Sequence, residues 1–218
     1  MRFVRRLLVV IVVLGAALVG GDVYGRHWAE GQLRARIGAA VPEAQNVTAS
    51  IRSFPFVGRL ATAGEVQGVS AHAGPVTEGS ITFASIDVSL RGVKLDRKVL
   101  AQDRVVRLVG IDTGLVSAVM TAEQLSQALG GLPLTLTPGH VQATLQGTTV
   151  TAVVSLTSNE LRLAPAGRPV ISLRIPTNAL LPCSASAQVL EGRILLTCVL
   201  RAVPAGMIEA ALRAGSAG

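Results

Sequence analysis

The spacing of apolar residues changes once along the chain, from a helical period to the period of a strand. Between residues 26 and 41 the apolar positions recur three or four residues apart, which predicts an amphipathic helix that Pro42 ends. From residue 47 onward apolar and polar residues alternate, which is the pattern of half-buried β-strands. The first of these strands is expected over residues 47–52.

The strongest alternation is found in residues 141–164. The turns Gly147-Thr148 and Ser158-Asn159 divide this stretch into three runs, and the second turn sets Leu156 opposite Leu161. We therefore expect a three-stranded antiparallel meander with one aliphatic face and one polar face.

Residues 80–90 are also strand-like, but their apolar positions change parity. Ile81 and Phe83 share one parity, whereas the apolar residues from Ile86 onward share the other. We expect one strand with a bulge near Ala84-Ser85, because an inserted residue returns the later side chains to the same face.

Two short helices are expected among the strands. Thr121-Ala122-Glu123-Gln124 has the sequence of a capping box, and Pro204 is placed to open a C-terminal helix through Leu212. With these elements the predicted fold is α+β, dominated by antiparallel strands around one core.

The first 21 residues differ from the rest of the chain. Three arginines in Met1–Arg6 precede fifteen uncharged residues, Leu7–Gly21, which is the pattern of a signal or membrane-anchoring segment. A cleaved signal and a retained anchor both remain open, because such a run is short for a hydrocarbon core of about 30 Å, while Val19-Gly20-Gly21 is a poor cleavage site. We favour the anchor, and divide the chain into a transmembrane signal-anchor, residues 1–21, and a β-rich domain, residues 22–218.

The position of the arginines before the apolar run predicts a single-pass protein whose C-terminal domain lies outside the cytoplasm, on the periplasmic side. Cleavage would make the protein secreted. In either case the compartment is oxidising, which bears on the two cysteines, Cys183 and Cys198. Alternating runs on both sides of Glu191-Gly192 predict a hairpin with the two cysteines on one face. We expect a disulfide, and two buried thiols are the alternative.

Composition narrows the function classes. Hydrophobic residues make up 50% of the chain but aromatic residues only 3%, so the core must be aliphatic. The net charge is +7, yet arginines are scattered singly and lysines occur only at positions 94 and 98, which argues against nucleic-acid binding. A diffuse positive charge suits anionic lipid headgroups, although a bias of genome composition toward arginine would also produce it.

No catalytic constellation is evident. His27, His72 and His140 stand far apart, and there is no glycine-rich phosphate loop, so we expect neither a metal, nor a cofactor, nor an enzyme activity. Asp112-Thr113-Gly114 matches the tripeptide of aspartic proteases, but the sequence has one copy, so a dimeric protease would be needed to pair Asp112. A turn-forming tripeptide is the simpler interpretation.

The sequence around residue 54 resembles a known family. The basic and apolar N-terminus, the amphipathic helix, the short strand and then Ser53-Phe54-Pro55-Phe56, with Leu60 and Gly64 following, are similar to the DUF2993 family. That family is also called the lipomannan-elongation-factor-like phospholipid-binding proteins of actinobacterial cell envelopes. The resemblance extends over residues 22–214 and includes Leu90-Arg91-Gly92-Val93 and the cysteine hairpin. Its motifs are hydrophobic patterns, and none of them is catalytic.

The resemblance implies a fold like that of tubular lipid-binding domains, in which a curved antiparallel sheet is wrapped on a long helix and leaves an elongated apolar cavity. It further implies phospholipid binding or transfer in envelope lipid or lipoglycan metabolism. The implied ligand is an anionic, phosphatidylinositol-type lipid, and the implied partner is an envelope glycosyltransferase. The alternative from another class is a structural or adaptor protein with a closed core that docks a partner enzyme.

Two of the four phenylalanines, Phe54 and Phe56, stand next to the first predicted strand. Our hypothesis is that this turn forms the mouth of a lipid site. There Phe54, Phe56 and Leu60 would meet the boundary between headgroups and acyl chains, while Arg52 and Arg59 meet a phosphate. The alternative is that both rings pack the start of the sheet against the amphipathic helix.

Overall fold

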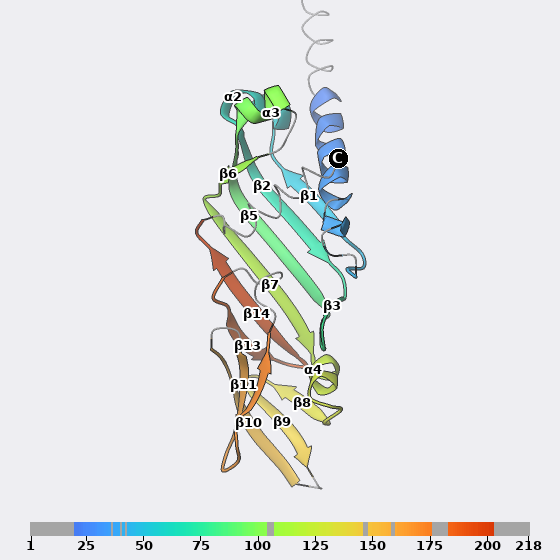
Figure 1. Ribbon diagram of the computed structural model, residues 1–218, viewed down its shortest axis with the longest axis vertical. Coiled ribbons are helices and arrows are strands. Elements are labelled where there is room, and N and C mark those ends of the chain that lie inside the picture. The colour runs from blue at the N-terminus through green and yellow to red at the C-terminus, as the bar shows by residue number, and fades with distance from the viewer. Residues whose placement is uncertain are drawn as a thin grey trace, which may run out of the picture.

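The computed structural model describes residues 20–35, 37–39, 41, 43–103, 107–145, 148–157, 160–175 and 183–202. These residues form an elongated molecule built mostly of antiparallel strands (Figure 1). Residues 1–19 of the expected anchor segment, residues 1–21, and the expected helix from Pro204 through Leu212 lie outside them. Among the described helices, none combines the length and the apolar character that crossing a bilayer requires.

A seven-stranded sheet is the larger of the two main sheets, and all its pairings are antiparallel. Its centre consists of β2 (Glu65–Ala73), β5 (Ser85–Leu95) and β7 (Thr113–Thr121). On one side, β1 (Thr48–Arg52) pairs with β2. On the other side, β14 (Arg193–Leu200) pairs with β7, and β13 (Ser186–Leu190) pairs with β14. The short strand β6 (Leu108–Gly110) pairs with β5. Among the described strands this sheet is open, with β1 and β13 at its edges.

The predicted meander is confirmed and forms the middle of a second, five-stranded sheet. Its strands, in the order in which they pair, are β12 (Ile171–Arg174), β11 (Glu160–Pro165), β10 (Thr148–Thr157), β9 (His140–Leu145) and β8 (Leu134–Thr137). Leu156 pairs with Leu161, as predicted. Thr148, which was expected in the first turn, pairs with Leu145, so the register there differs from the predicted one, but the aliphatic side chains stay on one face.

The bulge expected near Ala84 is wrong. β4 (Ile81–Phe83) pairs with β3 (Val76–Glu78) in a two-stranded sheet, whereas β5 begins at Ser85 and belongs to the large sheet. The Ala84 N–H donates to the carbonyl oxygen of Val119 in β7 at 2.7 Å. The change of parity therefore marks the point where the chain passes from one sheet to the other.

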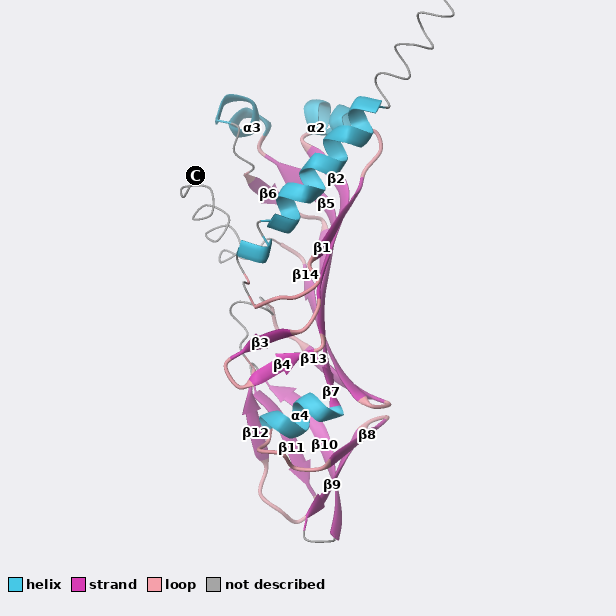
Figure 2. Cartoon of the chain, turned by 90° about the vertical axis from the view of Figure 1, so that its right-hand side faces the viewer, coloured by secondary structure: helices cyan, strands magenta, loops and turns pink. Residues whose placement is uncertain are grey.

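The amphipathic helix begins earlier than predicted, since residues 20–35 and 37–39 are helical. Figure 2 shows this N-terminal helix lying across one face of the large sheet, beside β1, β2 and β5. On the same face, further along the molecule, lie β3, β4 and α4 (Ala122–Ala128). The other two helices, α2 (Phe56–Ala63) and α3 (Arg97–Asp103), stand at the end of the molecule where the N-terminal helix starts (Figures 1 and 2).

The caps of the short helices follow from the sequence. The predicted capping box is confirmed: Thr121 Oγ1 accepts from the Gln124 N–H at 3.3 Å, and Gln124 Oε1 accepts from the Thr121 N–H at 2.9 Å. α2 ends at Gly64, which has a left-handed φ of 65° and donates its N–H to the Leu60 carbonyl at 3.1 Å.

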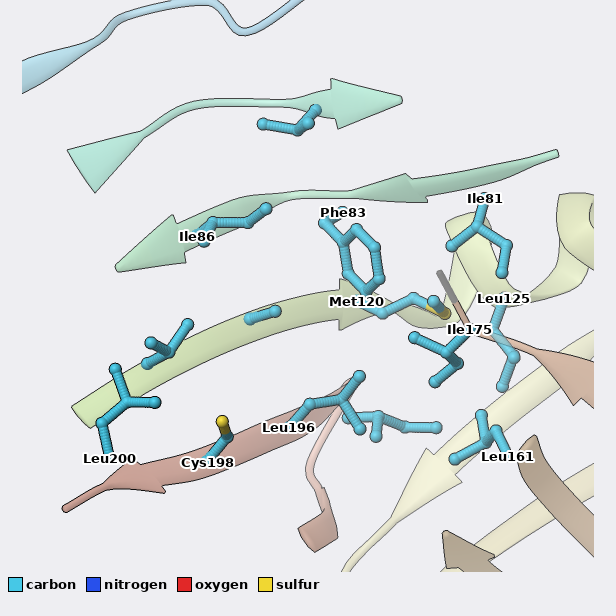
Figure 3. Packing of buried hydrophobic residues seen from close by; sticks show 14 of the residues in the cluster. Ile81, Phe83, Ile86, Met120, Leu125, Leu161, Ile175, Leu196, Cys198 and Leu200 are labelled. Atoms are coloured by element: carbon cyan, nitrogen blue, oxygen red, sulfur yellow. The ribbon is translucent and has the colours of Figure 1, made fainter. Parts of the chain in front are cut away.

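The most tightly packed core lies where α4, β3 and β4 cover the large sheet. The side chains of Phe83, Leu125 and Leu161 are fully buried there, and Figure 3 shows them converging with Met120 and Ile175. They come from both main sheets, from β4 of the two-stranded sheet and from α4, and Ile175 follows β12. The predicted α+β fold with one aliphatic core is confirmed at this level of detail.

Candidate functional site

The face of the large sheet on which the N-terminal helix and α4 lie, which we call the inner face, is aliphatic. Directly opposed residues in an antiparallel pair point to the same side, so the register defines rows of side chains across the sheet. Three rows make up most of the inner face: Ile51, Val69, Leu90, Gly114 and Leu200; Ala49, Ala71, Val88, Val116 and Cys198; and Ala73, Ile86, Ala118, Leu196 and Ala187.

Burial along the inner face is uneven. Near α4, Ala118 and Ile194 are fully buried. Nearer the N-terminal helix, Val69, Val88 and Leu90 are only half-buried, although their strands β2 and β5 have a neighbouring strand on each side. Neighbouring strands cover the flanks of such a side chain, but its end is covered only by what packs above the sheet. The remaining exposure therefore shows that this part of the inner face is incompletely covered.

Small residues line the incompletely covered part. Ala49, Ala71 and Ala73 occupy inner-face positions in β1 and β2, and all three are half-buried. Gly114, in the same row as Leu90, is instead buried, because the side chains of Leu90 and Leu200 fill the space over it. Small side chains leave room above the strands, so an apolar ligand can approach the sheet closely.

The opposite, outer face of the same strands is polar. The hydroxyls of Ser50 and Ser70 lie 3.3 Å apart, and His72 Nδ1 lies 2.8 Å from Asp87 Oδ1 across β2 and β5. The His72 and Asp87 side chains are both well exposed. The outer face is thus mostly polar, with one exposed apolar pair, Leu115 and Val199, whereas the rows of the inner face are aliphatic.

The structure separates the two phenylalanines of the Ser53-Phe54-Pro55-Phe56 turn. Phe56 is 6% exposed and belongs to the core, whereas Phe54 is 68% exposed. Leu60 packs against the core, while Arg52 is exposed and Arg59 half-buried. Of the five residues predicted to bind lipid, those with substantial accessible surface are therefore Phe54 and the two arginines.

Two carboxylates of the N-terminal helix hold it against this turn. Asp22 Oδ1 accepts from the Val57 N–H at 2.7 Å, and Glu30 Oε1 accepts from the Ile51 N–H at 2.8 Å. A Cβ on Gly25 would lie 3.0 Å from Val57 Cγ2, so the helix and the start of α2 are in direct contact. The glycine thus permits the close approach of the two helices.

Sequence reasoning missed two exposed aromatic residues beside this contact. Tyr24 is 76% exposed and Trp28 is 63% exposed, and both belong to the N-terminal helix. They are the chain's single tyrosine and single tryptophan. Their spacing of four residues, which puts both on one side of a helix, was the available signal.

Asp112 contacts two residues of β5, Lys94 and Gly92. Its Oδ1 accepts a hydrogen bond from Lys94 Nζ at 2.7 Å, and this bond raises the pKa of Lys94 above its ordinary value. The carboxylate also lies over Gly92, whose φ is 57° and where a Cβ would collide with it. Within the described part of the chain, no three His, Cys, Asp or Glu side chains gather in a way that could hold a metal ion.

The predicted disulfide is present between Cys183 and Cys198, with their Cα atoms 5.8 Å apart. The hairpin has the predicted register, since Val189 pairs with Ile194 and Ala187 with Leu196. Because Cys198 stands on the inner face between Leu196 and Leu200, the disulfide joins the segment before β13 to that face.

Comparisons with known proteins identify a family. Neither the curated proteins nor the solved structures yielded a significant match. The model of a family described as LmeA-like phospholipid-binding matches residues 20–212, which include all of the sheets described above. Since this match covers most of the chain, the protein belongs to the LmeA-like phospholipid-binding family, also known as DUF2993.

Proposed function

We propose that this protein binds, and transfers, a phospholipid outside the cytoplasmic membrane, with an acyl chain lying on the incompletely covered part of the inner face. The observation that carries the proposal is the half-buried aliphatic surface of Val69, Val88 and Leu90. Family membership supplies the class of ligand, and this surface supplies a place for its apolar part.

The chemistry of the surface suits an acyl chain. Transfer of one methylene group from water to an apolar surface gains about 0.8 kcal/mol. About ten methylenes on the inner face would therefore gain about 8 kcal/mol before the cost of ordering the chain, which is the scale of micromolar affinity. Flexible acyl chains need an aliphatic surface without specific polar partners, and the rows of alanine, valine and leucine provide one.

In this proposal the N-terminal helix and the large sheet together act as the tubular arrangement that the family resemblance implies. The strands of the large sheet bend along the molecule in Figure 2, and the helix lies along one face of them. The main-chain hydrogen bonds to Asp22 and Glu30 support this arrangement, because they fix the helix beside the inner face. The lipid would lie between the two.

The headgroup would lie at the end where α2 stands. A phosphate cannot enter an aliphatic surface without a large desolvation cost, so it must remain near charged or wet groups. Arg59 of α2 and Arg52, which lies on the outer face of β1, offer positive charge at that end, and Phe54 and Leu60 offer apolar contact. Together with the net charge of +4 on residues 22–218, which is what remains of +7 without Arg2, Arg5 and Arg6, this favours anionic phospholipids, including those of the phosphatidylinositol type.

The biological setting of the proposal is the cell envelope. Residues 1–21 would anchor the chain in the cytoplasmic membrane, with residues 22–218 on the periplasmic side as a non-enzymatic lipid-binding domain. Lipid delivered there would support lipid or lipoglycan metabolism, with an envelope glycosyltransferase as the partner. The order of arginines and apolar residues at the N-terminus and the family membership support this setting.

Native mass spectrometry tests the proposal. The full chain would be purified in mild detergent from a bacterial membrane and transferred intact to the gas phase. We expect one phospholipid per chain, with anionic headgroups enriched over their share in the host membrane. A chain that carries no lipid, and takes up none from vesicles of phosphatidylcholine and phosphatidylinositol, would refute lipid binding and favour the adaptor alternative.

A further inference from the structure

Large exposed aromatic side chains gather at one end of the molecule. Tyr24 and Trp28 on the N-terminal helix are 76% and 63% exposed, and Phe54 and Val57 at the start of α2 are 68% and 45% exposed. The two elements touch, because Asp22 bonds the Val57 N–H and Gly25 meets the Val57 side chain. We call Tyr24, Trp28, Phe54 and Val57 the aromatic end.

This placement is selective in a chain with few aromatic residues. The sequence has one tryptophan, one tyrosine and four phenylalanines. Among the described phenylalanines, Phe56 and Phe83 are buried and Phe54 is exposed. Amphipathic tryptophan and tyrosine rings favour the interface between water and lipid, where the ring is buried and its polar atom stays hydrated.

The charges around the aromatic end are mainly positive. Arg52, Arg59 and Lys98 all have accessible surface there. Two neighbouring carboxylates already accept main-chain hydrogen bonds: Asp22 from Val57, and Asp96 from the N–H groups of Lys98 and Val99. A surface that combines aromatic rings with unmasked basic groups complements an anionic bilayer rather than another acidic or aliphatic protein face.

The guanidinium of Arg97 keeps α3 beside α2, because it donates to the carbonyl oxygens of Ala61 and Thr62. Figures 1 and 2 place α2, α3 and the start of the N-terminal helix at one end of the molecule, and Arg59 belongs to α2 and Lys98 to α3. The apolar run Leu7–Gly21 leads directly into the N-terminal helix at this same end. The chain thus continues from an apolar, membrane-suited sequence into the aromatic end.

We propose that the aromatic end docks on the surface of an anionic phospholipid bilayer, with the rings of Tyr24, Trp28 and Phe54 at the level of the headgroups. This inference rests on the proposed function for its purpose, since docking would bring the α2 end of the inner face to the membrane from which lipid is taken. To the proposed function it adds the surface of the protein that contacts the membrane, the orientation of the molecule on it, and the bilayer as the partner. The long axis of the molecule stands away from the bilayer, with the five-stranded sheet distant from it.

Phe54 is the residue to test, because 32 residues, 22–53, separate it from the apolar run, whereas Trp28 lies close to that run in sequence. We would replace Trp28 by phenylalanine and place the single tryptophan at position 54 (Trp28→Phe with Phe54→Trp). The matched control is Trp28→Phe with Val153→Trp. Val153 is an apolar residue of β10 and, like Phe54, it is exposed, at 55%. Both full-length variants are reconstituted into vesicles of phosphatidylcholine and phosphatidylglycerol.

The readout is tryptophan emission and its quenching by lipids brominated along the acyl chain. For the tryptophan at position 54 we expect emission at shorter wavelength than in detergent and quenching that is strongest for bromines near the glycerol. High salt and pure phosphatidylcholine should both weaken the quenching, because they remove the attraction of the basic groups. The tryptophan at position 153 should show neither effect.

Equal emission and equal lack of quenching at positions 54 and 153 would overturn the docking surface. A wavelength shift at position 54 that follows protein concentration in detergent, with none on addition of vesicles, would identify self-association and also overturn it. A brominated lipid bound as a ligand could also quench the tryptophan. The quenching in vesicles is therefore compared with the quenching of the same variant in detergent with one brominated lipid bound. Native mass spectrometry of the same variants shows separately whether lipid binding itself has failed.

Discussion

The two parts of the inner face differ in what lies above them. Toward α4, Phe83, Leu125 and Ile194 are fully buried, because β3, β4 and α4 close over the sheet. Toward the N-terminal helix, Val69, Val88 and Leu90 stay half-buried. The first end has the packing of an ordinary core. The second keeps apolar surface available, which is what a protein needs if it is to bind lipid and release it.

Stability and ligand binding are therefore expected to separate along one sheet. Substitutions toward α4 should change the free energy of unfolding with little effect on lipid occupancy of the folded chain. Substitutions on the half-buried part should change lipid occupancy with little effect on the free energy of unfolding. The following predictions test this division.

Replacing Leu125 by alanine should have the largest effect. Leu125 is fully buried in α4, and truncation of such a leucine leaves a cavity that costs about 3–5 kcal/mol. Urea unfolding followed by circular dichroism measures the loss. A loss below about 1 kcal/mol would mean that the α4 end is not the closed core described here.

Removing the disulfide should cost somewhat less. Cys183 and Cys198 are separated by 15 residues in sequence, and a loop of this length gives a stabilisation of about 3 kcal/mol in the chain-entropy account. The variant Cys183→Ser with Cys198→Ser should therefore unfold at lower urea concentration than the parent. Because Cys198 lies on the inner face, lipid occupancy measured by native mass spectrometry shows whether the disulfide also shapes the lipid surface. Unchanged stability would contradict a structural role for it.

Replacing Asp22 by alanine tests what holds the N-terminal helix in place. The Asp22 carboxylate is buried and accepts the Val57 N–H, and loss of a hydrogen bond to a charged group costs about 1.5–3 kcal/mol. Hydrogen exchange at β1 and β2 should rise, because the helix would leave the inner face more often. Asp22→Asn, which keeps an acceptor oxygen, is the control. Equal exchange in the parent and Asp22→Ala would show that this contact does not fix the helix.

The smallest effect is expected for the α4 capping box. Thr121→Ala removes the side-chain oxygen that accepts the Gln124 N–H, and loss of such a cap typically costs about 1 kcal/mol. Thr121→Ser keeps the hydroxyl and should stay close to the parent. Lipid occupancy should not change in either variant. A change in lipid occupancy would contradict the independence of the two ends.

Local pattern predicted much of the fold. The register of the cysteine hairpin, the pairing of Leu156 with Leu161 and the capping box at Thr121 all depend on neighbours close in sequence. The passage at Ala84 could not be predicted, because parity tells which face a side chain occupies and not to which sheet its strand belongs. A bulge and a change of sheet produce the same alternation.

The candidate site was less predictable. The sequence placed Phe54 and Phe56 together, but only the three-dimensional fold shows that α2 buries one ring and leaves the other exposed. The half-buried inner face was also beyond sequence reasoning, since the exposure of Val69 or Leu90 depends on what packs above them. Their alternation alone is the same in a closed core and in a lipid-binding surface.

The most direct test of the central claim compares two alanines of the inner face. Ala71 is half-buried near the N-terminal helix, and Ala118 is fully buried near α4. Ala118→Leu should destabilise the chain by about 1–3 kcal/mol, because the core there has no room. Ala71→Leu should leave stability nearly unchanged and lower the bound lipid seen by native mass spectrometry, because the added side chain occupies the acyl-chain surface. Equal destabilisation by both substitutions, with lipid occupancy unchanged in Ala71→Leu, would contradict the account.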